Sequence, residues 1–248
     1  MPAFNSAPFI ADAINSVRSQ TLLDWELIIY DDASTDGTVD IASRLAAEDS
    51  RLVLLRGDNN RKTARARNTA IQQARGRYIA FLDSDDLWKP EKLEKQITFM
   101  REGGHELSFT SYDRIDEVGR ALGGVSVSKP VNYDELLKWC CIGCLTAVYD
   151  TELIGKHYAP DIPRRQDFAL WLAILKRVDF AWPMQESLAI YRVRKSSLSS
   201  NKLVAARYNW MVYRDIEELS LLRAAHVFAH YAVRGVWRTY LARPGRRR

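Results

Sequence analysis

The sequence predicts an α/β domain built around a mostly parallel sheet. Short apolar runs alternate with helical patterns over the first hundred residues, and this spacing implies right-handed crossovers between neighbouring strands. The chain has 248 residues, 47% hydrophobic and 27% charged, so it is long enough for one large domain with a core. Two acidic stretches, each directly after an expected strand, predict a site at one edge of that sheet.

The expected elements follow from the period of the apolar residues. Pro90 suits the first turn of a helix, and the regular alternation changes after Gly103 and Gly104. A polar, hairpin-like excursion is expected at 114–124. The expected strands cover 26–30, 51–55, 78–82, 106–112, 145–149 and 188–193, and the expected helices cover 7–20, 38–47, 63–75, 90–101, 133–139, 166–177 and most of 202–241.

Almost no chain precedes the first expected helix. A helix that leads into a strand of a parallel sheet normally follows a strand of its own, and only residues 1–4 are available for it. We therefore expect a truncated first strand, either because the true start of the protein lies upstream of Met1 or because the first strand has been trimmed.

Three carboxylates, Asp83, Asp85 and Asp86, stand within four residues after the strand at 78–82. Charges of one sign repel, so this crowding favours a bound cation. Mg²⁺ or Mn²⁺ held by one or two carboxylates, with water and a diphosphate as the other ligands, fits the pattern. The alternative is an acidic turn that caps the next helix.

Asp31 and Asp32 follow the strand at 26–30, so both acidic sets are expected at the same edge of the sheet. One set would bind a base or ribose while the other holds a metal on the phosphates. Lys62, Arg65 and Arg67 could bind a diphosphate through charge-assisted hydrogen bonds, or form a solvated basic helix face.

Asp167 lies in the first turn of its expected helix, where the helix dipole alone would favour a carboxylate. Cys140, Cys141 and Cys144 are odd in number and clustered, which argues against a disulfide framework. Small buried residues are the preferred interpretation over a redox or metal role.

The net charge of +5 is unevenly distributed. Residues 202–248 carry ten Lys and Arg against three acids, a net of +7, which leaves 26 basic and 28 acidic residues, a net of −2, for the rest. With its aromatic residues this tail suits a helix on an anionic membrane surface, or ordinary packing with a basic outer face. Residues 1–248 contain no apolar stretch of about 18 residues and no signal peptide, so we expect a cytoplasmic protein, or one peripheral on the inner face of the cell membrane.

Four motifs, PAFN, DWELIIYDDASTDGT, ARNTAIQQARGRYIAFLDSDD and QDFALWL, resemble in order and spacing the inverting glycosyltransferases of family 2, which have the GT-A fold. The resemblance covers residues 1–200 and leaves 201–248 as a basic, amphipathic helical tail. It implies transfer of a sugar from a nucleotide-sugar, with UDP as the expected carrier. The implied acceptor is a saccharide or lipid-linked hydroxyl in surface polysaccharide biosynthesis.

The resemblance also assigns residues. Asp83 and Asp85 match the DxD motif, with Asp85 as the direct metal ligand, and Asp167 matches the catalytic base, although Gln166 replaces the usual Glu before it. The remaining assignments concern the donor. Asp32 matches the residue that contacts uracil, and Pro2 and Ala3 match the loop that lines the nucleotide. Arg194 stands where the family has His in the stretch 191–196 and is expected to contact the diphosphate.

Three other functions are compatible with parts of the sequence. A nucleotidyltransferase would normally bring a Gly-rich phosphate loop, and residues 1–248 contain none. A nucleic-acid-binding protein could use the basic aromatic tail but leaves the acidic edge unexplained. A non-catalytic sugar-nucleotide-binding protein would be consistent with the truncated first strand.

Overall fold

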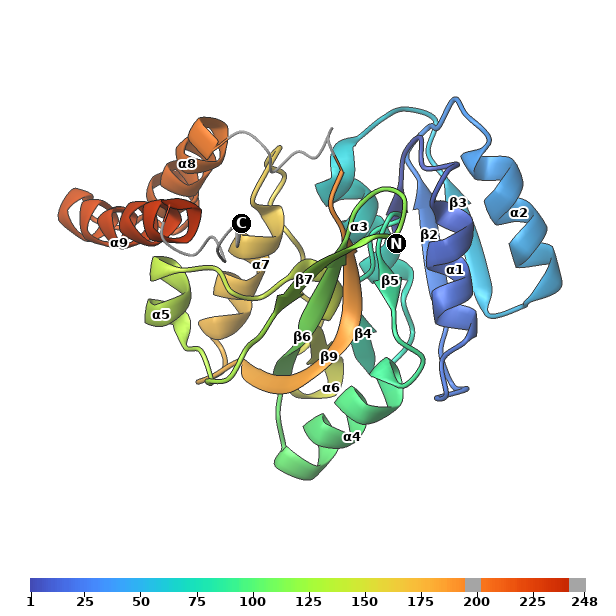
Figure 1. Ribbon diagram of the computed structural model, residues 1–248, viewed down its shortest axis with the longest axis horizontal. Helices are drawn as coiled ribbons and strands as arrows, with labels where there is room; N and C mark the ends of the chain where they lie inside the picture. Colours follow the sequence, from blue (N-terminus) through green and yellow to red (C-terminus); the bar gives the residue numbers. More distant parts are fainter. Residues whose placement is uncertain (195–201, 241–248) are drawn as a thin grey trace, which may run out of the picture.

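The computed structural model describes residues 1–194 and 202–240 (Figure 1). Its strands are β1 (Pro2–Ala3), β2 (Leu27–Asp31), β3 (Leu52–Arg56), β4 (Tyr78–Ala80), β5 (Leu87–Trp88), β6 (Leu107–Ile115), β7 (Ala121–Val125), β8 (Val148–Asp150) and β9 (Trp182–Arg192). Its helices are α1 (Ile10–Arg18), α2 (Thr38–Glu48), α3 (Lys62–Gln73), α4 (Lys92–Gly103), α5 (Tyr133–Lys138), α6 (Thr151–Ile154), α7 (Gln166–Leu175), α8 (Lys202–Met211) and α9 (Leu221–Tyr240).

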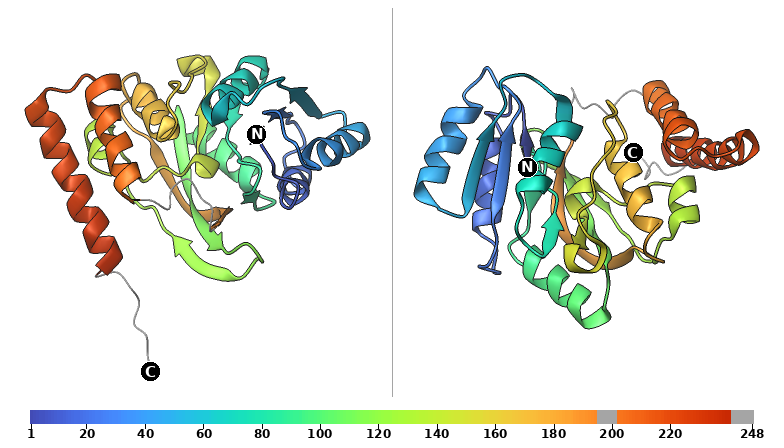
Figure 2. Two further views of the ribbon diagram at one scale, coloured as in Figure 1. Left: turned by 90° about the horizontal axis from the view of Figure 1, so that it is seen from above. Right: turned by 180° about the vertical axis from the view of Figure 1, so that it is seen from behind.

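The first sheet has the order β1-β2-β3, and all its pairs are parallel. Strand β2 is buried along its whole length, as expected for a strand covered on both faces. Helices α1 and α2 pack beside this sheet at one end of the molecule, and α8 and α9 lie at the opposite end (Figure 2). The predicted alternation of strand and helix is confirmed here.

The second sheet has the order β4-β8-β6-β9-β5, with β7 also paired to β6. Only β6 and β9 run parallel in it. Strand β8 is antiparallel to β4 and β6, and the turn Asp116–Arg120 folds β7 back onto β6 as a hairpin. The expectation of mostly parallel pairing therefore holds for the first sheet, and the second is mixed because hairpin and edge pairings replace crossovers after Gly104.

Strand β1 is only two residues long, and within the described residues it pairs with β2 but not with β4. A groove of about 780 Å³ lies between the two sheets, and Met1, Ile28, Ile79 and Trp25 are among its lining residues. The Met1 ammonium is buried there and donates to the Ile28 carbonyl at 2.8 Å; burial, then the Arg67 charge, lowers its pKa to about 5.

Helix α7 is the centre of the larger core. The sequence predicted an amphipathic helix, but Phe168–Leu172, Ile174 and Leu175 are all buried, so this helix is covered on nearly every side. The tail forms two helices joined through a π-helical turn, Val212–Ile216. Its Val212, Tyr213 and Val227 are part of the same core, so the described part of the tail is packed onto the domain.

One cation is buried without a carboxylate partner in the contacts described. Lys92 of α4 is fully buried, its Nζ donates to Gln96 Oε1 at 2.7 Å, and it lies 4.5 Å from the centre of the Trp88 ring. Burial lowers the pKa of Lys92 from 10.5 to about 7. The folded state therefore disfavours the protonated form.

This shift predicts a pH-dependent stability. Between about pH 7 and 10.5 the unfolded chain binds a proton at Lys92 that the folded chain does not, so the contribution of Lys92 to the free energy of unfolding rises with pH in that window and is level on either side. Lys92→Met removes a penalty of about 4 kcal/mol at pH 7, and the difference from wild type vanishes toward pH 10. Urea unfolding from pH 6 to 10 measures it; parallel curves for the two proteins would contradict the shift.

The groove beside Met1 predicts a second stability effect. An engineered extension of about five Val and Ile residues joined to the Met1 nitrogen would convert the buried ammonium into an amide and could pair with both β2 and β4. We expect the extension to raise the melting temperature by about 5 °C or more, because several apolar side chains become buried. A Gly-Ser extension of equal length is the control. Equal melting temperatures for the two extended proteins would show that the groove does not accept a strand.

Candidate active site

The chain brings the ends of β1, β2 and β4 together. The amide of Asp32, just after β2, donates to the carbonyl of Ala3 in β1 at 2.8 Å. The hydroxyl of Ser84, four residues after β4, lies 2.7 Å from the hydroxyl of Ser6, and both side chains are buried. Pro2, Ala3, Asp32 and the Asp83–Asp86 segment therefore lie at one edge, as the sequence predicted.

Arg67 lies at the centre of this edge. It projects from α3, its side chain is only 6% exposed, and its Nη2 is 2.6 Å from Asp83 Oδ1. Burial alone would lower the pKa of the guanidinium, but the nearby Cys144, Asp83 and Asp167 outweigh burial and raise that pKa. Because burial keeps the Cys144 thiol protonated at neutral pH, the two carboxylates are the charges that matter.

Asp85 and Asp86 differ in their surroundings. Asp85 Oδ2 is 3.1 Å from Arg194 Nη1, and burial together with the neighbouring Asp83 charge raises the pKa of Asp85. Asp86 is 2% exposed and accepts a hydrogen bond from the Arg192 amide at 2.9 Å. The alternative of an acidic turn that caps the next helix is therefore wrong for Asp86. Its carboxylate anchors the end of β9, and burial raises the pKa of this carboxyl well above the usual range.

Asp32 is 3% exposed, and both of its carboxylate oxygens accept backbone hydrogen bonds. The amide of Arg61 donates to Oδ1 at 2.7 Å and that of Lys62 to Oδ2 at 2.8 Å. Asp32 therefore fixes the turn that begins α3 and so orients Arg67. The Lys62 side chain is exposed, and its described contact with the site is through its backbone.

Asp167 lies in the first turn of α7, within electrostatic reach of Arg67 and of the buried Cys140. Burial, then the Asp167 charge, raises the pKa of the Cys140 thiol, so this cysteine is protonated at neutral pH. Cys140 and Cys144 are thus partly buried thiols near the site, and the spacing of the cysteines gave no signal of this proximity. Arg67 brings Asp83 and Asp167 into one electrostatic cluster although the two are 84 positions apart in the sequence.

Four non-glycine residues with left-handed backbone flank the site. Asn5, Ala33, Lys62 and Arg165 have φ between 47° and 74°, a region that such residues rarely adopt. Asn5 and Ala33 lie close in sequence to Ala3 and Asp32. Lys62 is the first residue of α3, and Arg165 lies two residues before Asp167. Strained backbone gathers at ligand-binding and catalytic sites, because the surrounding structure must hold functional groups in place.

The acids suit a divalent cation for which water and a substrate diphosphate provide most of the ligands. Among residues 1–194 and 202–240, no group of three or more His, Cys, Asp or Glu side chains is arranged to hold a metal. Asp85, with Asp83 beside it, could hold such a cation together with water and a diphosphate. Mg²⁺ and Mn²⁺ bound with phosphates typically have such a ligand set.

The fold and this acidic edge define a glycosyltransferase of the GT-A fold. The family model for glycosyl transferase family 2 matches residues 1–149, and the chain belongs to this family. TuaG of Bacillus subtilis strain 168, named for teichuronic acid biosynthesis, is 44% identical over 236 residues, which cover 95% of this chain and 94% of TuaG. WfgD of Escherichia coli, named a UDP-Glc:α-D-GlcNAc-diphosphoundecaprenol β-1,3-glucosyltransferase, is 38% identical over 237 residues, covering 95% and 92%.

Solved structures show the same fold at lower identity. S. aureus TarS, crystallised as 1-349 with UDP-GlcNAc, has a TM-score of 0.74 and 20% identity, over 96% of this chain and 71% of that one. The mannosyltransferase PcManGT from Pyrobaculum calidifontis, in complex with GDP-Man and Mn²⁺, has a TM-score of 0.68 and 17% identity, over 98% and 74%. These likenesses confirm the predicted fold class.

Proposed function

We propose that this glycosyltransferase transfers a sugar, with inversion, from a UDP-sugar to a hydroxyl of a saccharide or lipid-linked acceptor during surface polysaccharide synthesis. The observation that carries the proposal is the convergence of Asp83 and Asp167 on the buried Arg67, with Asp85 next to Asp83. The names of TuaG and WfgD support the polysaccharide context, and the UDP-GlcNAc complex of TarS supports the donor class.

The nucleotide would bind along the ends of β1 and β2. Phe4, directly after β1, is 47% exposed, and its ring can stack on a base. A carboxylate has about four acceptor positions, so Asp32 can accept a base N–H as well as its two backbone donors. The sequence interpretation assigned Pro2 and Ala3 to the loop that lines the nucleotide but did not assign Phe4. An aromatic residue directly after a strand end was the signal that could have indicated it.

Asp167 would act as the general base. An acceptor hydroxyl is a weak nucleophile at neutral pH. Asp167 would take the hydroxyl proton as the hydroxyl oxygen attacks the anomeric carbon from the side opposite the diphosphate. A single displacement inverts that carbon, so one base suffices. A divalent cation on Asp85, beside Asp83, would stabilise the charge that develops on the leaving diphosphate when it is bound. Arg67 pairs with Asp83 and places a positive charge within electrostatic reach of Asp167.

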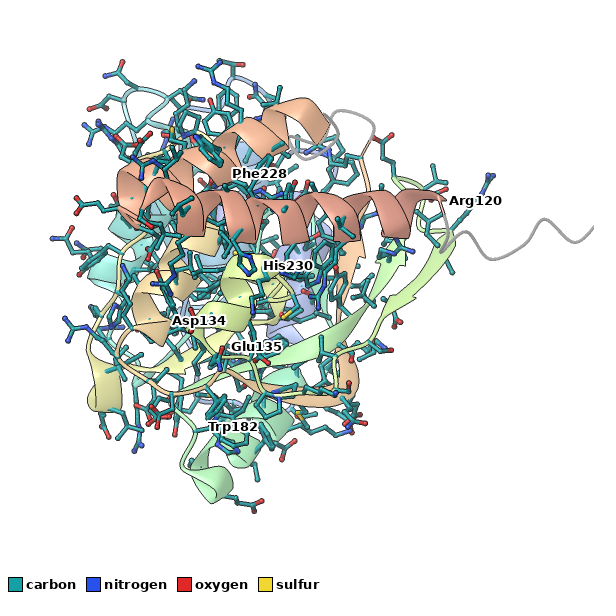
Figure 3. All side chains as sticks on the ribbon, turned by 90° about the vertical axis from the view of Figure 1, so that its left-hand side faces the viewer. Arg120, Asp134, Glu135, Trp182, Phe228 and His230 are labelled. Atoms are coloured by element: carbon teal, nitrogen blue, oxygen red, sulfur yellow. The ribbon has the colours of Figure 1, made fainter. Side chains whose placement is uncertain are left out.

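The tail would place the enzyme near a lipid-linked acceptor. Helix α9 packs inward through Ala224, Val227 and Phe228, with Phe228 against Trp210 of α8 (Figure 3). On other sides Leu222 is 85% exposed and Val233 is 68% exposed. Among the described residues no helix is both long and apolar enough to span a bilayer. We propose instead that α9 lies on an anionic membrane surface; the side chains of 235–240 and the arginines at 246–248 are outside what the structure describes.

The role of Asp167 can be tested by Asp167→Asn. We expect transfer to fall by about 10²- to 10⁴-fold because the hydroxyl loses its proton acceptor, while UDP-sugar affinity stays within about twofold. A panel of sugar nucleotides with Mn²⁺, first in thermal-shift and then in transfer assays, identifies the donor and measures the loss.

Asp179→Asn is the matched control, because Asp179 is an exposed carboxylate beyond the other end of α7. This control should retain full activity. Retained turnover in Asp167→Asn would exclude Asp167 as the base, and the absence of sugar-nucleotide binding in the wild-type protein would contradict the proposed function as a whole.

The membrane contact can be tested without removing the tail, whose residues belong to the core. Leu222→Glu with Val233→Glu should reduce co-sedimentation with phosphatidylglycerol vesicles by about tenfold, because charged groups replace the exposed apolar side chains. Leu153→Glu, at a residue 55% exposed on α6, is the control for added charge. Equal vesicle binding by both variants and wild type would exclude α9 as the contact.

A further inference from the structure

Both acids of the Asp83–Asp85 segment are already paired with arginines. Arg67 Nη2 lies 2.6 Å from Asp83 Oδ1, and Arg194 Nη1 lies 3.1 Å from Asp85 Oδ2. A cation that binds Asp85 must therefore compete with a guanidinium that is already there. The sequence interpretation assigned Arg194 to the diphosphate, but in this structure its partner is the expected metal ligand.

The two ion pairs differ in how readily they can open. The Arg67 side chain is 6% exposed in the middle of a helix, so separating it from Asp83, whose side chain is 35% exposed, would leave the guanidinium buried without that partner. The Arg194 side chain is 31% exposed and that of Asp85 is 25% exposed, so both groups can be solvated after separation. Arg194 follows the end of β9, and its guanidinium lies 5.1 Å from the centre of the Phe9 ring.

The backbone next to Arg194 is anchored to the acidic segment. The amide of Arg192 donates to Asp86 Oδ1 at 2.9 Å, and its Nε donates to the carbonyl of Asp85 at 2.9 Å. The Arg192 side chain is 6% exposed. The backbone of Arg194, two residues after Arg192, is therefore held near Asp85. Only the side chain of Arg194 needs to move for the ion pair to open.

We propose that Arg194 is an exchangeable counter-ion of Asp85. It neutralises Asp85 in the free enzyme, is displaced when a divalent cation arrives with the donor, and then pairs with the donor diphosphate. This inference rests on the proposed function. A cation alone must displace Arg194 without offering it a new anion, whereas a cation with a diphosphate offers one. Metal and nucleotide should therefore strengthen each other's binding, and Arg194 accounts for part of that coupling.

Calorimetry with Mn²⁺ alone, UDP alone and both together tests the exchange on the folded full chain. Arg194→Gln should bind Mn²⁺ alone about three- to tenfold more tightly than wild type, because the competing cation is gone. With Mn²⁺ present the same variant should bind UDP about three- to tenfold less tightly than wild type, because the diphosphate loses a partner. Arg223→Gln is the matched control, because it breaks an exposed ion pair between Arg223 of α9 and Asp134 of α5. This variant should bind both ligands as wild type does.

Two failures are distinguishable. If Mn²⁺ binding in wild type does not depend on Asp85, as judged by Asp85→Ala, both the proposed metal site and the exchange are wrong. If that binding does depend on Asp85 but Arg194→Gln binds Mn²⁺ alone no more tightly than wild type, only the exchange is wrong. Thermal denaturation of each variant confirms that it is folded.

Discussion

The ion pair between the buried Arg67 and the half-buried Asp83 is the interaction on which the site depends. Several carboxylates at the end of one strand would repel each other and raise each other's pKa. Arg67 supplies a fixed positive charge among them, and its side chain is almost completely buried. Removing one partner of such a pair leaves an unpaired charge in a poorly solvated place, which is strongly destabilising. The geometry of α3 is therefore tied to the acids after β4.

The position of α3 depends in turn on Asp32. Its carboxylate accepts the amides of Arg61 and Lys62, and this holds Lys62 in a left-handed conformation at the start of the helix. A change of the Asp32 side chain would thus act on Arg67 and, through Arg67, on Asp83. The proposed base site at Asp32 and the proposed diphosphate site at Asp83 are therefore joined by a short path of hydrogen bonds and one helix.

The sequence was sufficient for the parts of the fold that depend on local pattern. The apolar runs before Asp31 and Asp83 predicted two buried strands with acids at their ends, and β2 and β4 have these positions. It did not predict the antiparallel pairings of β8 or the contact of Arg194 with Asp85, because these join residues far apart in the chain. The left-handed Ala33, Lys62 and Arg165 were also missed, since Ala, Lys and Arg carry no local signal for that conformation.

The tail and the expected catalytic base are connected through α7. Tyr213, in the π-helical turn of the tail, packs its ring edge-on against Phe168, the residue after Asp167, and donates its hydroxyl to the carbonyl of Leu137. Because α7 is buried on nearly every side, it cannot turn without disturbing these contacts. The tail thus sets the orientation of the first turn of α7. An exposed face on α9 and a carboxylate on α7 are in this way parts of one packed unit, so a surface that binds α9 would hold Asp167 at a defined position relative to that surface.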